Sequence, residues 1–97
     1  MNPDTMNQDA LDNLYWSLRK GDMISLTFSS CMSRKLTLTL TVTSPHRTVG
    51  KRKVNRVILK QDTLGLKFTL FNDDNRTSLA VGDMGALIHD ATLVHPA

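Results

Sequence analysis

Basic side chains are concentrated in the middle of this 97-residue chain. Between residues 23 and 61 there are eight Lys and Arg residues and no acid, while all nine acids lie outside this segment. The net charge of +3 therefore conceals a strongly basic centre between mildly acidic ends, and this asymmetry predicts an anionic partner. The candidate binding residues are Arg34, Lys35, Arg47, Lys51, Arg52, Lys53, Arg56 and Lys60.

Other residue types that perform chemistry are poorly placed for it. The three histidines are far apart and the cysteine is single, so no zinc site is predicted. His89 and Asp90 are neighbours in a predicted strand, where side-chain alternation points them to opposite faces, the wrong geometry for an oriented base. Ser29, Ser30 and Cys31 lie in a predicted turn with no candidate base nearby in the sequence. We therefore expect no enzyme, no cofactor and no metal.

Length and composition favour one domain spanning residues 1–97, because 40% hydrophobic content at this size supports one core. Cys31 has no partner for an internal disulfide, which fits either a reducing compartment or a fold that does not depend on crosslinks. No apolar run approaches the ~20 residues of a membrane span, and the first residues lack the features of a signal peptide. These features predict a soluble cytoplasmic protein with no membrane partner.

The elements that must position the cations begin with one helix, over about residues 6–20. Its apolar positions recur at i, i+3, i+4 and i+7, and they are Leu11, Leu14, Tyr15 and Leu18. Thr5 and Gln8 have capping-box spacing, and Gly21 is placed to end the helix in a left-handed conformation. Trp16 lies beside the apolar stripe, so it either closes the edge of the core or remains an exposed contact residue.

After Gly21 the hydrophobic period changes from 3.6 to 2, which predicts strands. The clearest is 36–43, where Leu and Val alternate with Thr. The predicted strands are 23–28, 36–43, 54–60, 66–71, 78–81 and 86–94, within a β meander of about 23–94. Short, strongly twisted strands in this order predict a mostly β fold, a small antiparallel barrel or roll of five or six strands with one N-terminal helix.

One helix followed by a small barrel resembles the layout of Sm-like and several SH3-like domains. The closing strand of Sm proteins carries an Arg-Gly motif, whereas the corresponding stretch here reads Leu87-Ile88-His89-Asp90. The resemblance is therefore limited to the layout.

Side-chain alternation along the predicted strands places the cations on the outer surface of the sheet. In the strand 54–60, Val57 and Leu59 point one way and Arg56 and Lys60 the other. With Val57 and Leu59 in the core, Arg56 and Lys60 are expected beside the Thr hydroxyls of 36–43. The predicted loop 45–53 adds four further charges. Cations flanked by hydroxyl donors hold phosphate oxygens without reading bases.

These patterns predict a non-enzymatic nucleic-acid-binding or regulatory module that contacts phosphates, with DNA and RNA both open. Only Phe71 and Trp16 remain as stacking residues, which favours a duplex or structured nucleic acid over a bare single strand. Two other interpretations of the cations are a merely solvated face and attraction to an acidic protein. The alternative function is a protein-interaction or assembly subunit, for example a viral or accessory structural protein, that forms a homo-oligomer through the barrel edge or the helix.

Overall fold

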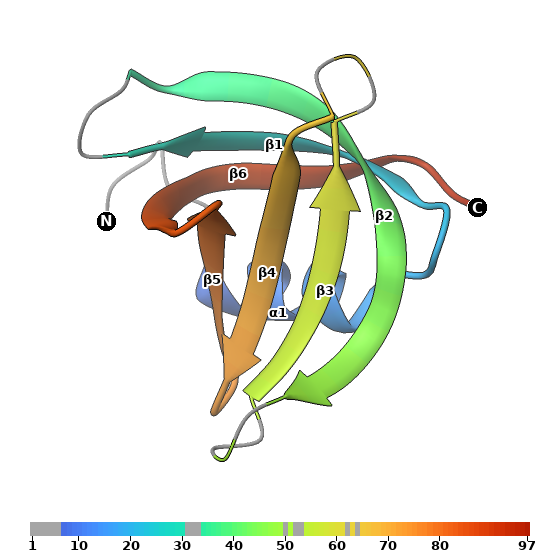
Figure 1. The fold of residues 1–97 in the computed structure, drawn as a ribbon, viewed down its shortest axis with the longest axis vertical. Helices are drawn as coiled ribbons and strands as arrows, with labels where there is room; N and C mark the ends of the chain where they lie inside the picture. The colour runs from blue at the N-terminus through green and yellow to red at the C-terminus, as the bar shows by residue number, and fades with distance from the viewer. Residues whose placement is uncertain (1–6, 31–33, 50, 52–53, 62, 64) are drawn as a thin grey trace.

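Six antiparallel strands close into a barrel in a computed structural model of the chain (Figure 1). The structure describes residues 7–30, 34–49, 51, 54–61, 63 and 65–97. The elements are α1 (Gln8–Ser17), β1 (Met23–Ser29), β2 (Leu36–Val49), β3 (Val54–Lys60), β4 (Lys67–Asp73), β5 (Arg76–Val81) and β6 (Met84–His95). Each strand pairs with the next, and β6 pairs with β1. The predicted mostly β fold, a small antiparallel barrel after one helix, is confirmed, and the number of strands is six.

Alternation along the strands decides which side chains fill the barrel. In β1 the burial alternates strictly, with Ile24 and Leu26 fully buried between half-buried neighbours. In β3, Val57 and Leu59 are fully buried, as predicted. Leu36 is 49% exposed although it has the inward phase of β2, because it begins the strand at the open end of the barrel.

β2 is longer than predicted, because residues 44–49 continue the strand instead of forming a loop. The register shifts between Val42 and Ser44 and again between Ser44 and Arg47, so β2 contains two bulges. Pro45 lies in the second bulge. Since proline has no N–H to donate to the ladder, a bulge is one of the few places where a strand accepts it.

The helix is shorter than the predicted span 6–20. Asn7 caps its start, and the Asn7 side chain accepts a hydrogen bond of 2.8 Å from the N–H of Asp9. The predicted cap Thr5 lies outside the described residues. Leu18 ends the helix in an extended conformation, so Gly21 is not the helix cap. Gly21, at φ 96°, instead turns the chain into β1 and donates its N–H to the carbonyl of Val42 at 2.8 Å.

A buried aspartate holds the turn between helix and barrel. Asp22 accepts the N–H of Arg19 on one carboxylate oxygen and the N–H of Ala97 on the other, each at 2.7 Å. The C-terminal end of the chain is thereby attached to the turn that follows α1. Within the part of the chain that the structure describes, no helix has the length and apolar character needed to cross a membrane.

The core gives a direct test of the assigned faces. Leu40 is fully buried in β2, whereas its neighbour Thr39 is exposed. Leu40→Ala is therefore expected to lower the free energy of unfolding by about 2–5 kcal/mol. Thr39→Ala should cost about 0.5 kcal/mol or less, because it removes only surface atoms. Urea denaturation of both variants checks this, and equal losses would contradict the orientation of β2.

Candidate functional site

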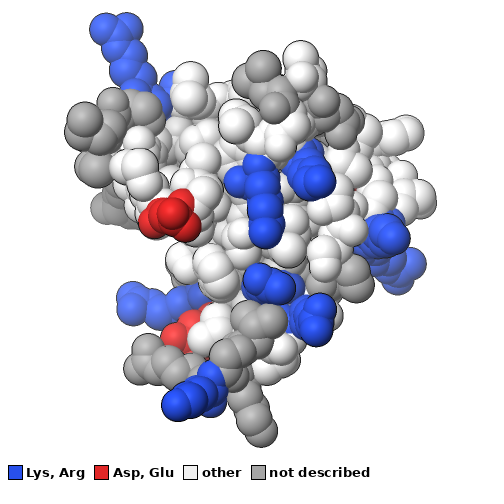
Figure 2. Space-filling model, in the orientation of Figure 1, with Lys and Arg blue, Asp and Glu red and all other residues white. Residues whose placement is uncertain are grey.

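The outward surface of β2, β3 and β4, here called the basic face, gathers positive side chains (Figure 2). β2 and β3 contain no acid, and the only acid of β4 is Asp73, at its last position. No ion pair joins the cations of this face to any other described residue. Within the part of the chain that the structure describes, no carboxylate therefore neutralises the positive charge of this face. Its cations are Arg47, Arg56, Lys60 and Lys67.

One row of this face crosses the upper ends of β3 and β4. Thr41 of β2 lies opposite Lys60 of β3, as predicted, and Lys60 lies opposite Lys67 of β4. Both lysines are exposed. Lys67 lies outside the acid-free segment and was not among the predicted binding residues. Alternation along the predicted strand 66–71 could have identified it, because it places Lys67 on the outer face.

A second row crosses the other ends of the same strands. Arg47 of β2 lies opposite Arg56 of β3, which in turn lies opposite Phe71 of β4. The expectation that a threonine of 36–43 flanks Arg56 is wrong. The pairing of Thr41 with Lys60 places Arg56 beyond the last of these threonines, and the two bulges of β2 bring Arg47 opposite it. The hydroxyl of Thr43 is also engaged, since it donates to the carbonyl of Ile58 at 3.3 Å. The second row thus offers two guanidinium groups and one aromatic ring.

The remaining predicted cations do not all join the face. Lys51 is exposed in the turn between β2 and β3, near the second row. Arg34 and Lys35 are exposed but precede β2, at the opposite end of this long strand from Arg47 (Figure 1). Arg52 and Lys53 lie outside the described residues.

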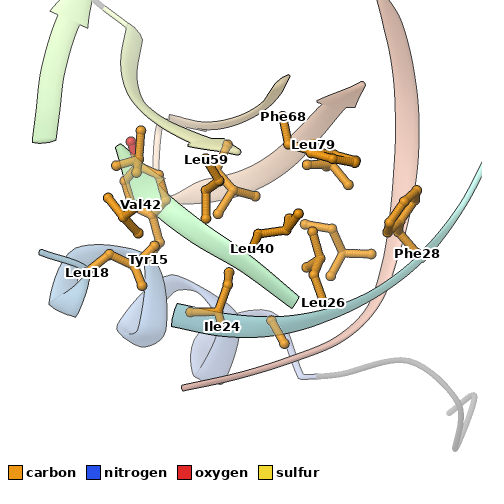
Figure 3. Close-up of a cluster of buried hydrophobic side chains, with 14 of the residues drawn as sticks. Tyr15, Leu18, Ile24, Leu26, Phe28, Leu40, Val42, Leu59, Phe68 and Leu79 are labelled. Carbon is orange, nitrogen blue, oxygen red and sulfur yellow. The ribbon is translucent and has the colours of Figure 1, made fainter. Parts of the chain in front are cut away.

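A polar cluster links α1 to the end of β2 beside Arg47. The Tyr15 hydroxyl donates to Oδ1 of Asn55, and Nδ1 of His46 lies 3.0 Å from the same oxygen. Burial raises the pKa of the Tyr15 phenol above its ordinary value, so the hydroxyl stays protonated as a donor. Trp16 stacks on His46 with ring centroids 5.3 Å apart and is 50% exposed, so it is a surface residue and does not close the core. Figure 3 shows Tyr15 and Leu18 directed from α1 towards Val42.

A serine–histidine contact was not foreseen in the sequence. Ser29 ends β1 instead of lying in a turn, and its Oγ is 2.7 Å from Nε2 of His89. In the β1–β6 ladder, Thr27 pairs with Asp90 and Phe28 with Ile88, which leaves His89 as a bulge residue. No base is near Ser29 in the sequence, because His89 lies 60 residues away, and the fold brings the two together.

Among the described residues, the Ser29–His89 pair has no third member of a catalytic triad beside it. Nδ1 of His89 is buried and has no hydrogen-bond partner among the described residues, so no carboxylate there orients the ring. Among those residues, no group of three or more His, Cys, Asp or Glu side chains is close enough to hold a metal ion. The pair is a hydrogen bond between strands, and the basic face is the stronger candidate site.

Comparisons of the chain with protein-family models, with curated proteins and with solved structures give no match. The candidate site therefore depends on its geometry and charge alone.

Proposed function

We propose that the chain is a non-enzymatic nucleic-acid-binding module that contacts phosphates through the basic face. The observation that supports this is the arrangement of four cations as two like-charged cross-strand pairs, Arg47 with Arg56 and Lys60 with Lys67. Like charges directly opposite each other destabilise a sheet. A phosphate between the members of each pair accepts hydrogen bonds from both and removes their repulsion.

The spacing of the pairs suits a repeating anion. Arg56 and Lys60 are four residues apart on β3, which corresponds to about 13 Å along the strand. Phosphates recur regularly along one strand of a duplex, so two cation pairs at this separation can contact two different phosphates of the same backbone. The face therefore fits contact with the backbone of a nucleic acid, which positions the protein without reading sequence.

Phe71 lies half-buried beside Arg56. It is the one aromatic residue in the outward phase of β2, β3 and β4 among the residues described. Single-strand binders stack successive bases on several aromatic side chains. A single ring favours a duplex or structured nucleic acid, held mainly by its phosphates.

Salt dependence tests this proposal. Affinity for double-stranded DNA, single-stranded DNA and RNA is measured by fluorescence anisotropy between 50 and 200 mM salt, a range where phosphate contacts respond strongly. Four neutralised phosphates predict a slope of about −3.6 in log K against log salt for a duplex and about −2.8 for a single strand. A flat salt response, or no binding at the lowest salt, would contradict the proposal.

The alternative function as an assembly subunit has less support from the fold. The apolar stripe of α1 is engaged within the chain, since Leu11, Tyr15 and Leu18 are buried against the barrel. The first and last strands of the barrel pair with each other. The edges that an open sheet would offer to a second copy of the chain are therefore already paired. Sizing chromatography at several protein concentrations separates the two functions, because an assembly subunit shows a concentration-dependent mass.

A further inference from the structure

An apolar cavity of about 200 Å³ opens at the end of the barrel away from Tyr15. Five of the six strands and the segment before β4 contribute apolar side chains to its wall. They include Phe28, Leu36, Leu38, Leu66, Phe68 and Met84. An apolar cavity of ~150 Å³ already accepts a benzene molecule, so this one is large enough for a short alkyl chain.

The rim of the cavity exposes large apolar side chains to solvent. Leu36 is 49% exposed, Leu66 is 44% exposed and Met84 is 46% exposed. Clustered exposure of this kind in a small barrel marks a surface that binds something apolar, and the mouths of β-barrels are common ligand sites.

Cations lie beside the apolar rim on its β2 and β4 sides. Lys35 directly precedes Leu36 and is exposed. Lys67 lies between Leu66 and Phe68 in the chain, and its cross-strand neighbour is Lys60. On the opposite side, the turn between β5 and β6 carries Asp83, directly before Met84. Among the described residues, the β2 and β4 sides of the mouth therefore carry cations, and the β5–β6 turn carries an acid. A ligand that fits this arrangement has an apolar tail and one anionic head, with the head towards the lysines.

We propose that the mouth of the barrel binds one medium-chain fatty acid, with the alkyl chain in the cavity and the carboxylate at Lys67 and Lys60. At ~30 Å³ for each small group, comparable to the liquid volume of a water molecule, the cavity holds about six or seven carbon atoms. Octanoate is the fitting member of the series. This inference rests on the cavity and its rim and does not require the proposed nucleic-acid function.

Calorimetric titration with butanoate, hexanoate, octanoate and decanoate, each below its micelle concentration, tests the chain length. Affinity is expected to rise about three- to fourfold per methylene up to octanoate and then to level off, because the cavity is full. Octanol should bind more weakly than octanoate to the unmodified protein. Absence of octanoate binding, or an affinity that does not change with chain length, would overturn the proposal.

Matched variants locate the site. Leu66→Asp places a carboxylate at the mouth and should weaken octanoate binding at least tenfold, whereas Leu93→Asp, at a similarly exposed position of β6, should leave it unchanged. Lys67→Gln should weaken octanoate binding several-fold without changing octanol binding. Equal effects of the two Asp variants would overturn the proposal. So would binding to anionic vesicles without binding to free octanoate, because the rim would then be a membrane-docking surface.

Discussion

Deletion of residues 1–20 is expected to leave an unfolded or aggregating chain. The deletion removes Leu11, Tyr15 and Leu18, which are all at least 95% buried against the barrel. Burial of each large apolar side chain contributes ~1.5–3 kcal/mol, so the three together account for about 5–9 kcal/mol. A small domain has only ~5–15 kcal/mol of total stability, so most or all of it is lost. Circular dichroism and sizing chromatography measure the outcome.

Loss of the helix also leaves polar groups without their partners. Asn55 loses the hydrogen bond that the Tyr15 hydroxyl donates to its Oδ1, and one such bond contributes about 0.5–1.5 kcal/mol. Asn13→Ala, on the exposed side of α1, is the matched control and should leave stability nearly unchanged. A truncated protein that is folded and monomeric, derived from an oligomeric parent, would show instead that α1 mediates assembly.

Strand positions could be predicted from the sequence because they depend on local alternation. The predicted strand 54–60 has the observed bounds of β3, and the predicted 23–28 is one residue shorter than β1. The extension of β2 beyond Thr43 could not be predicted. Proline is typical of turns, and the sequence alone does not reveal the bulge that allows Pro45 to lie in a strand. Bulges depend on the partner strand, and therefore on contacts that are distant in the sequence.

The difference between local alternation and contacts between strands also explains which parts of the candidate site could be predicted. The outward direction of Arg56 and Lys60 follows from the inward direction of Val57 and Leu59, and this part was predictable. The residue opposite Arg56 could not be predicted, because the register depends on how two strands pair and not on the sequence of one strand. The contact between Ser29 and His89 was hidden for the same reason, since 60 residues separate the two.

Replacement of Arg47, Arg56, Lys60 and Lys67 together by serine should weaken nucleic-acid binding by about fivefold to several hundredfold at low salt. An exposed charge contact is worth ~0.2–1 kcal/mol, so four of them contribute about 1–4 kcal/mol to binding. The salt slope should also flatten, because counterion release scales with the number of phosphates neutralised. Anisotropy titrations at two salt concentrations measure both quantities.

The stability of this fourfold variant separates a binding defect from a folding defect. All four side chains are on the barrel exterior, and their removal abolishes two like-charged cross-strand pairs, so the midpoint of thermal unfolding should stay the same or rise. The control variant replaces the same number of exposed cations elsewhere, at Arg19, Lys20, Arg34 and Arg76. If both variants lose affinity equally, the binding depends on net charge and not on the basic face, because only the arrangement of the cations distinguishes them.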